Sequence, residues 1–464
     1  MNDLTVVILA AGLGTRMKSR KAKVLHEAGG LTLIEHVVAS ALQLARPDGV
    51  IVVVGHQAEQ VRARVAGRGV RFVEQTEQLG TGHALIACRE AAGSARGDLV
   101  LLYGDGPLLS ANTVRRLIEQ RRASGAAAAL ITTKLEDPAG YGRAITGGKG
   151  RVLAIVEDKV ATPEQRDICE INSGIYCFDA ALLWKHISEI QPNPVSKEYY
   201  LTDIVEILNR AGHEVRAMLH PDATELLGIN TRVELAEVDR IFRERRCREL
   251  MLAGVTIERP ETVTIDTAVE VGMDSVIEPF ARILGTTHIG ENCRVGAGSV
   301  LRNVRVASRV AIAPYTVIEE SVIEADVTIG PFARLRPGSH VHAAAHIGNF
   351  VELKNTRMGA GARAGHLAYL GDSEIGSDVN VGAGTITCNF DGAVKHRTSI
   401  GEGAFVGSNS TLVAPLEIGP GSYVAAGSVV TQAVPADALA IGRSRQTNKD
   451  GWAKQRRERQ QRSS

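Results

Sequence analysis

The order of hydrophobic and polar positions changes character about halfway along the chain. In the first half, short apolar runs alternate with segments of helical periodicity; the runs cover residues 4–9, 50–54, 99–103 and 127–132. Such runs are typical of buried strands in a parallel sheet. Residues 32–45 place their apolar side chains on one helical face behind a capping box of Thr32 and Glu35. This alternation predicts a doubly wound, Rossmann-like α/β domain whose ligands bind beyond the carboxyl ends of the strands.

In the second half, aliphatic residues recur every six positions. The first series is Val271, Ile277, Ile283, Ile289, Val295 and Leu301, and two more run over residues 317–347 and 400–430. Six-residue spacing with small turn residues predicts a parallel β-helix, in which stacked coils share one aliphatic core. The phase slips over residues 301–317 and 381–400, so we expect loops there, and loops on a rigid scaffold often carry function.

A charged segment joins the two halves. Residues 231–250 begin with a second capping box, Thr231 and Glu234, and carry a narrow apolar stripe, so they predict a connecting helix. We therefore expect a first domain over residues 1–232, a helical linker over 233–253 and a β-helix domain over 254–464, ending in a basic C-terminal arm.

Composition narrows the class of protein. The chain has 53 basic and 52 acidic residues, a formal net charge of +1, so no global field recruits nucleic acid or acidic membranes. The segment at residues 1–12 lacks a basic signal-peptide region, and no apolar run approaches the roughly 18 residues of a membrane span. The six cysteines form no CxxC pair, which indicates reduced thiols and a cytoplasmic protein.

A glycine-rich loop, LAAGLGTRM, follows the first apolar run at residues 9–17. It lacks the third glycine of a dinucleotide-binding fingerprint and the Gly-Lys-Ser/Thr of a P-loop. We expect it at a strand-to-helix turn, where backbone N–H groups, Arg16 and Lys23 would hold phosphate. Asp105 ends another strand at the same sheet edge and suits Mg²⁺. These residues predict nucleotidyl transfer or a plain nucleotide-binding module, with nothing to choose between them.

A second polar cluster interrupts the β-helix rhythm around GHLAYLGD, residues 365–372. His366 suits a general base that takes a proton from an attacking amine. Its expected companions suit an anionic sugar phosphate: Arg336, Lys354, Tyr369 and Asn380. The other histidines of this region are interpreted as structural residues: His340, His342 and His346.

At this point the motifs become recognisable. LAAGLGTRM is followed in order by EQLGTGHA (77–84), LLYGDGPL (101–108), DPAGYGR (137–143), IVEDK (155–159), EINSGIY (170–176) and GINTR (228–232). With the six-residue repeats, nearly the whole chain resembles the bacterial bifunctional N-acetylglucosamine-1-phosphate uridyltransferase/glucosamine-1-phosphate acetyltransferase family. The resemblance implies a nucleotidyltransferase domain, a left-handed parallel β-helix of hexapeptide repeats and a homotrimer with sites between subunits.

The resemblance assigns roles to matching positions of the first domain. It implies UTP and UDP-N-acetylglucosamine binding by Leu9, Ala10, Ala11, Gly12, Lys23, Gln75, Gly80, Thr81, Tyr103, Gly104, Asp105, Gly140, Glu157, Asn172 and Asn230. Within this set Gln75, Gly80 and Thr81 would contact uracil, and Gly140, Glu157 and Asn172 the sugar. Asp105 and Asn230 would bind Mg²⁺, and Arg16 would stabilise the leaving pyrophosphate. Ala22 stands where the family usually has proline, so we expect a looser backbone before Lys23.

In the β-helix, the resemblance implies that His366 is the general base and that Arg336, Lys354, Tyr369 and Asn380 bind glucosamine 1-phosphate. The acetyl-CoA set would be Ala383, Asn389, Phe390, Ser408, Ala426 and Arg443. Phe390 replaces a common tyrosine, and its ring would still pack. Arg443 and the arm would reach a neighbouring subunit.

Other functions remain open at this level. A single-activity nucleotidyltransferase would use its solenoid only for assembly, but the cluster around His366 has no purpose there. A non-catalytic assembly subunit would have no use for Arg16, Lys23, Asp105 and Asn230 together.

Overall fold

A computed structural model describes residues 4–93, 96–194 and 196–463. The chain divides into two compact units, Met1–Arg243 and Glu244–Ser464, and the division falls within helix α9 (Arg232–Leu252). The expected capping box is present: Glu234 N donates to Thr231 Oγ1 at 3.2 Å, and Thr231 N donates to Glu234 Oε2 at 2.6 Å. The predicted helix over residues 231–250 is therefore confirmed.

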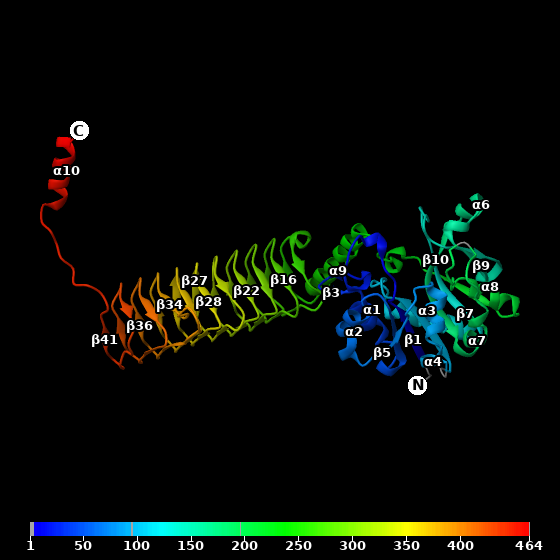
Figure 1. Ribbon diagram of the computed structural model, residues 1–464, viewed down its shortest axis with the longest axis horizontal. Coiled ribbons are helices and arrows are strands. Elements are labelled where there is room, and N and C mark those ends of the chain that lie inside the picture. The colour runs from blue at the N-terminus through cyan, green and yellow to red at the C-terminus, as the bar shows by residue number, and fades with distance from the viewer. Residues whose placement is uncertain (1–3, 94–95, 195, 464) are drawn as a thin grey trace. The chain divides into compact units, whose positions relative to one another are not determined.

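The first unit is built on one twisted sheet (Figure 1). Its order is β11-β7-β10-β6-β1-β4-β5, with β8 pairing β10 and β9. The bounds are β1 (Leu4–Leu9), β4 (Val50–Val54), β5 (Arg71–Glu74), β6 (Asp98–Tyr103), β7 (Ala128–Lys134), β8 (Arg143–Thr146), β9 (Val152–Val156), β10 (Glu170–Asp179) and β11 (Val215–Leu219). All four expected strands are present. The sheet is mixed rather than purely parallel, because β10 lies antiparallel between β6 and β7.

Helices cover both faces of this sheet. One face packs against α3 (Thr81–Ala87), α7 (Ala180–His186) and α8 (Asp203–Arg210). The other packs against α1 (Leu33–Ala41), α2 (Ala58–Val65) and α5 (Ala111–Ser124). Successive residues of β1 alternate between the two cores, Val7 and Leu9 on one side and Val6 and Ile8 on the other. A strand covered on both faces is apolar throughout, which is why β1 reads as an unbroken hydrophobic run.

Two smaller features complete this unit. The hairpin of β2 (Glu27–Ala28) and β3 (Leu31–Thr32) leads into α1, whose capping box of Thr32 and Glu35 is present as expected. Short helices α4 (Arg89–Ala92) and α6 (Pro163–Arg166) lie in connections. Because β1 pairs with β4 on one side and β6 on the other, the loops after β1 and β6 meet at the topological switch point of the sheet.

The second unit is a parallel β-helix with three sheets, and each complete coil contributes one strand to each sheet. The first sheet runs from β12 (Thr256–Ile257) to β41 (Leu439–Ala440), the second from β13 (Thr264–Ile265) to β40 (Val429–Val430) and the third from β14 (Glu270–Val271) to β38 (Leu416–Ile418). The six-residue aliphatic positions point inward: Ile277, Ile283, Ile289 and Leu301 are fully buried in one continuous core. The predicted solenoid is confirmed.

The two expected phase slips have different structural causes. In the third sheet, Glu270 pairs with His288 but His288 pairs with Arg305, so the later coil is one residue shorter. The second slip is a loop between β34 (Ile386–Cys388) and β35 (Thr398–Ile400). Helix α10 (Trp452–Ser463) lies in the basic C-terminal arm.

Candidate active sites

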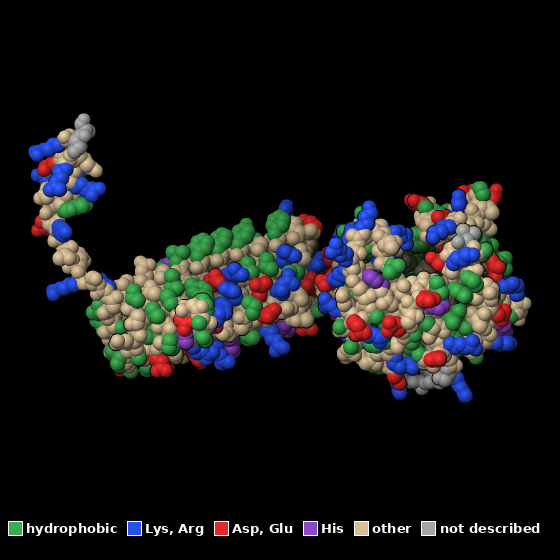
Figure 2. Space-filling view, viewed as in Figure 1, with side chains coloured by type: hydrophobic (Ala, Val, Ile, Leu, Met, Phe, Trp, Pro, Cys, Tyr) green, Lys and Arg blue, Asp and Glu red, His purple; other side chains and the backbone are tan. Residues whose placement is uncertain are grey.

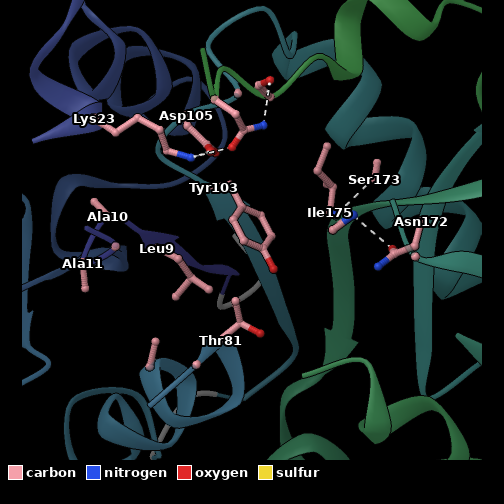
Figure 3. A pocket seen from close by; sticks show the side chains of 18 of the residues that line it. Leu9, Ala10, Ala11, Lys23, Thr81, Tyr103, Asp105, Asn172, Ser173 and Ile175 are labelled. Atoms are coloured by element: carbon pink, nitrogen blue, oxygen red, sulfur yellow. Dashed lines mark hydrogen bonds and ion pairs between the residues drawn. The ribbon is translucent and has the colours of Figure 1, made fainter. Parts of the chain in front are cut away.

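A pocket of about 590 Å³ opens at the carboxyl ends of β1 and β6 (Figure 3). Its lining includes every residue of the expected nucleotide-sugar set except Gly104, together with Arg16. Gly104 has a backbone role instead: its N–H donates to Leu9 O at 2.9 Å, and a Cβ there would lie 3.1 Å from Val24. The fold thus brings together residues separated by more than two hundred positions in sequence.

The glycine-rich loop does not lead directly into an α-helix, contrary to the expected strand-to-helix turn. It passes into a single 3₁₀ turn, Thr15–Met17, and α1 begins only after the β2–β3 hairpin. Gly14 adopts φ 62°, and a Cβ there would lie 2.7 Å from Lys23 Cβ, so glycine permits the close approach of the two segments. Gly12 has open space where a side chain would stand, which exposes its backbone to the pocket. A phosphate bound at this loop would therefore be held by loop N–H groups and side chains, without the N-terminal dipole of an α-helix.

Four charged or polar side chains meet on one side of the pocket. Lys23 Nζ forms an ion pair with Asp105 and lies 3.1 Å from Asn230 Oδ1 (Figure 3). Arg16 Nη2 donates to the same Asn230 oxygen at 2.8 Å. Asn230 N in turn donates to Glu234 Oε2 at 2.7 Å, so the capping residue of α9 also fixes this corner of the pocket.

The donor set fits Mg²⁺. The Asp105 carboxylate and the Asn230 amide oxygen converge on one cation, which is the Lys23 ammonium. Two oxygen ligands from the protein leave room for phosphate oxygens and water, which is the usual arrangement around Mg²⁺. Lys23 and a metal ion would therefore exchange places beside the same oxygens.

The backbone before Lys23 is held, so the expectation of a looser segment is wrong. Ala22 is buried, and its N–H donates to Gln57 Oε1 at 2.7 Å. Gln57 Nε2 donates to Arg20 O at 2.7 Å. Gln57 itself adopts φ 55°, a conformation that non-glycine residues take at a cost of about 1 kcal/mol. The side chain of Gln57 thus fixes the segment before Lys23.

The opposite side of the pocket presents a glutamine and a tight turn. Gln75 is buried after β5, and its Nε2 donates to Gly80 O at 3.2 Å. Gly80 adopts φ 103° at the start of α3, and a Cβ would lie 2.7 Å from Tyr199 O, so only glycine fits. Thr81 hydrogen-bonds to Tyr103, which is the last residue of β6 (Figure 3). Amide and hydroxyl groups of this kind suit a nucleobase edge.

Acidic and amide groups line the third side. Glu157 Oε1 accepts a hydrogen bond from Thr202 Oγ1 at 3.0 Å, and burial raises the pKa of its carboxyl above the ordinary value. Burial also raises the pKa of Tyr103, and the Asp105 and Glu157 carboxylates add to the rise. Asn172 sits where β10 loses register with β7, and its Oδ1 accepts from Gly174 N at 3.0 Å. This bulge turns Asn172 into the pocket, where hydroxyl-rich groups could bind.

In the β-helix, small residues stack in a column that begins at His366. β30 (Arg363–His366) pairs with β33 (Asn380–Val381), which pairs with β36 (Phe405–Val406) and then β39 (Tyr423–Val424). Continuing that register places Ala383, Ser408 and Ala426 above His366 in successive coils. Gly384 N donates to Leu367 O at 2.8 Å, as this register requires. Arg443 lies at the end of the column, its Cδ 3.8 Å from the position of a Gly427 Cβ.

Around the corner from His366, the second sheet carries the expected anion-binding cluster. Arg336 directly follows β25 (Arg334–Leu335), and Lys354 is the last residue of β28 (Glu352–Lys354). The strand register places these two residues level with each other in adjacent coils. Tyr369 begins β31 (Tyr369–Gly371) and folds back, so that a Cβ at Gly371 would meet its hydroxyl at 2.5 Å. Basic and hydroxyl side chains therefore lie together on the sheet that follows the candidate base along each coil.

Asn380 lies on the first sheet, whereas Arg336, Lys354 and Tyr369 belong to the second. It starts β33 and lies level with Arg363, three residues before the His366 column. At the rise of an extended strand that separation along the sheet is about 10 Å.

The loop between β34 and β35 is ordered by its own side chains. Asp391 accepts from the backbone N–H groups of Ala393 at 2.8 Å and Val394 at 2.7 Å. His396 pairs with the same carboxylate at 2.7 Å. Phe390 lies on this loop and is 59% exposed, so its ring is available to a ligand or a neighbouring chain.

Comparison with known proteins matches this two-part geometry. Residues 6–167 match the MobA-like NTP transferase domain, and residues 268–303 and 397–432 match the bacterial transferase hexapeptide (six repeats). The bifunctional protein GlmU of Solibacter usitatus is 61% identical over 454 residues, covering 98% of this chain and 97% of that protein. The bifunctional protein GlmU of Koribacter versatilis is 47% identical, covering 97% of this chain and 97% of that protein. The GlmU of Anaeromyxobacter sp. (strain Fw109-5) is 50% identical, covering 98% of this chain and 93% of that protein. This chain belongs to the GlmU family.

Membership in the GlmU family makes the chain a bifunctional enzyme. A nucleotidyltransferase domain precedes a left-handed parallel β-helix of hexapeptide repeats, as the motif resemblance implied. No helix in the described ranges is both long and apolar enough to cross a membrane.

The GlmU geometry also reveals residues that the sequence analysis missed. Asp372 lies 3.3 Å from Lys354 Nζ and contacts the Asn389 amide. Burial opposes ionisation of Asp372, but hydrogen bonds from Asn355, Asn389 and Lys354 hold its pKa below the ordinary range. Lys395, from the loop after β34, contacts Lys354, and this contact lowers the pKa of Lys395. Asp372 ends the GHLAYLGD motif, but its partners Lys354 and Asn389 lie 18 and 17 positions away, so no local pattern marks these contacts.

Proposed function

We propose that this chain makes UDP-N-acetylglucosamine in two steps. The β-helix domain acetylates glucosamine 1-phosphate with acetyl-CoA, and the first domain then transfers UMP from UTP to the product and releases pyrophosphate. The observation that carries the proposal is the convergence of the nucleotide-sugar set on one pocket, with a separate group of basic side chains on the sheet that follows His366. Membership in a bifunctional family supports two chemistries on one chain.

In the first domain, positioning and charge would perform the transfer. Gln75, Gly80 and Thr81 would hold uracil, while Glu157 and Asn172 would hold the sugar. A phosphate oxygen of the sugar phosphate attacks the α-phosphorus, and the bond to pyrophosphate breaks without a covalent enzyme intermediate. Asp105 and Asn230 would hold Mg²⁺, which neutralises charge on the phosphates. Arg16 and Lys23 would stabilise the negative charge that gathers on the departing pyrophosphate.

In the β-helix, His366 would accept a proton from the attacking amine as nitrogen bonds to the thioester carbonyl carbon. The carbon–sulfur bond then breaks, and coenzyme A leaves as the thiol. Arg336, Lys354 and Tyr369 would hold the sugar phosphate. The column of small residues that rises from His366 would accommodate acetyl-CoA along the solenoid, with Arg443 at its far end.

An exposed aromatic ladder supports a homotrimer. At the corner between the first and second sheets, Tyr315, Phe332 and Phe350 are 48–58% exposed and stack with ring centroids 5.4 Å apart. Leu367 continues the ladder and directly follows His366. Figure 2 shows hydrophobic side chains along one edge of the solenoid. Contiguous apolar surface of this kind marks a protein interface, and we infer that copies of this chain cover it.

This arrangement would place His366 at a subunit boundary. Asn380, which lies apart from the cluster of its own chain, would then reach the site of a neighbouring subunit, as would the C-terminal arm. The cysteines form no disulfide among the described residues, and we infer a cytoplasmic location for the trimer.

Thiol release from acetyl-CoA on addition of glucosamine 1-phosphate tests the proposal. The wild type should release thiol, and His366→Ala should lose the reaction while retaining pyrophosphate release from UTP and N-acetylglucosamine 1-phosphate. His346→Ala is the matched control, because His346 lies on the first sheet in a hydrogen bond with Thr328 at 2.7 Å. A folded wild type that releases no thiol would reduce the β-helix to a scaffold.

A further inference from the structure

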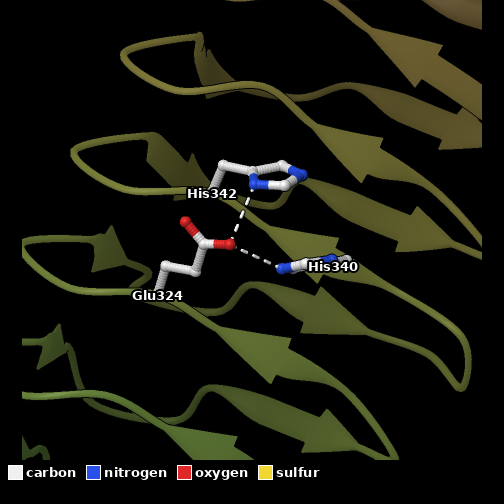
Figure 4. A group of neighbouring side chains, drawn as sticks. All are labelled: Glu324, His340 and His342. Atoms are coloured by element: carbon white, nitrogen blue, oxygen red, sulfur yellow. Dashed lines mark hydrogen bonds and ion pairs between the residues drawn. The ribbon is translucent and has the colours of Figure 1, made fainter.

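Two histidines and a glutamate cluster on the third sheet of the β-helix, outside both sites described above (Figure 4). Glu324 directly follows β23 (Val322–Ile323), and the histidines flank Val341 of β26 (His340–Val341) in the next coil. The register pairs Val322 with His340, which brings Glu324 level with His342. Neighbouring coils thus contribute one carboxylate and two imidazoles to one point.

All three side chains aim their ligand atoms at one another. Glu324 Oε1 lies 2.9 Å from His340 Nε2 and 2.9 Å from His342 Nδ1. The imidazole rings stack with centroids 4.1 Å apart, and the ligand atoms of the three residues all lie within 4.8 Å of one another. In a tetrahedral zinc site with bonds of 2.0–2.1 Å, neighbouring ligand atoms are about 3.3 Å apart. The two Glu324–histidine contacts are each about 0.4 Å shorter than that spacing.

The surroundings orient the carboxylate and leave it accessible. Glu324 Oε2 accepts the Ala343 N–H at 3.1 Å, which fixes the carboxylate with Oε1 toward the imidazoles. The three side chains are 30–38% exposed, so an ion can reach them from solution. Partial burial opposes ionisation, but the His340 contact, the Ala343 N–H and the His342 charge hold the pKa of Glu324 below its ordinary value. Glu324 forms no ion pair with a lysine or arginine of the described residues.

We propose that Glu324, His340 and His342 bind a divalent transition metal ion such as Zn²⁺. Two imidazoles and one carboxylate match the three protein ligands that zinc takes when water fills the fourth position. Imidazole nitrogen favours zinc, copper and nickel over magnesium and calcium, which prefer oxygen. The Ala343 N–H fixes the carboxylate in the manner of an outer-shell partner.

The ion would join two coils of the solenoid. Glu324 belongs to one coil, and the histidines belong to the coil that also carries β25 and Arg336. The third sheet is the side of each coil that does not border the aromatic ladder, so this site stays open when the ladder is covered. Metal binding would therefore hold the coil of Arg336 in register from the opposite side of the solenoid.

Zinc titration of the full-length protein tests the proposal. The protein is stripped with a chelator, returned to buffer with millimolar Mg²⁺ to occupy oxygen-rich sites, and titrated with Zn²⁺ by calorimetry. We expect one tight site per chain that weakens at least tenfold in His340→Gln and His342→Gln. His288→Gln is the matched control, because His288 contacts Glu270 at 3.0 Å on the same sheet as a single imidazole. Unchanged affinity in either test variant, or no one-to-one binding, overturns the proposal.

Cobalt spectroscopy identifies the ligands independently. Co²⁺ in a site of nitrogen and oxygen ligands gives visible d–d bands without the intense thiolate-to-metal band that cysteine ligation produces. We expect the d–d bands in the wild type and their loss in Glu324→Gln, which keeps the side-chain volume and serves as the test variant if a histidine variant does not fold. A thiolate band, or bands that persist in Glu324→Gln, would contradict the assignment.

Discussion

Removal of the Gln57 side chain gives a sharp test of the first site. Gln57 accepts the Ala22 N–H and donates to Arg20 O, both at 2.7 Å. Each hydrogen bond contributes about 1 kcal/mol, and a buried N–H left without an acceptor costs about 1–3 kcal/mol. We expect Gln57→Ala to destabilise the conformation before Lys23 by about 2–4 kcal/mol. At the lower figure, KM for UTP rises roughly 30-fold, because 1.4 kcal/mol is a factor of ten.

The reciprocal change is Ala22→Pro. Ala22 has φ −56° and ψ 141°, which proline adopts without strain. The ring Cδ replaces the amide hydrogen, however, and would come within about 1.5 Å of Gln57 Oε1 at its present position. Ala22→Pro alone should therefore also raise KM for UTP. In the double variant the ring has room and no N–H lacks an acceptor, so the double variant should lie closer to wild type than either single variant.

Pyrophosphate release measured against UTP concentration for the four proteins decides the matter. Thiol release by the β-helix domain is the internal control, because neither residue lies in that unit. Neighbouring substitutions that share one contact should be strongly non-additive. If the KM effects of the two single variants simply multiply in the double variant, the proposed role of Gln57 in fixing the segment before Lys23 is refuted.

Three further predictions concern the metal, a buried carboxyl and the ladder. Chelation of divalent ions by EDTA should lower pyrophosphate release more than about 100-fold, because Asp105 and the substrate phosphates would bind a metal ion in the first site. Thiol release, which takes place at the other site, should continue. Glu157→Gln should raise the melting temperature at pH 7–8 while weakening sugar binding. Burial raises the pKa of the Glu157 carboxyl in the folded protein. The carboxyl therefore favours folding only below its unfolded pKa, and this contribution is lost as pH rises through the folded pKa. The gain should vanish at acid pH, and exposed Glu119→Gln should show none. Phe332→Glu should convert the proposed trimer to monomers in light scattering, whereas Leu219→Glu, a change at an exposed residue of the first unit, should leave it intact. A Phe332→Glu protein that remains a trimer would rule out the ladder as the interface.

Periodicity alone was enough to predict the main elements. Both capping boxes, at Thr32 and Thr231, begin helices, because the partner glutamates lie three residues away and the signal is local. The six-residue spacing predicts the solenoid because each coil repeats the same inward position. The motif resemblance went further and grouped residues that line one pocket, including Asp105 and Asn230.

What the sequence did not predict depends on contacts between distant segments. β10 reverses direction between β6 and β7, and nothing in its residues states which strands it pairs with. Gln57 holds the segment before Lys23 through a hydrogen bond to Ala22 across 35 positions. Asn380 shares the polar character of the cluster near His366, but the coil geometry puts it at the other end of a strand. For Asn380, residue type predicted the polar character, while strand register decided the position.

A stack of repeating coils also isolates its middle from its ends. Each strand of the β-helix pairs only with strands one coil before and one coil after, so a disturbance must pass through every intermediate coil to travel. His366 lies on the seventh of the eleven strands of the first sheet, with coils on either side. Fraying at either terminus is therefore damped before it reaches the proposed base, and the length of the solenoid beyond His366 acts as insulation for its geometry.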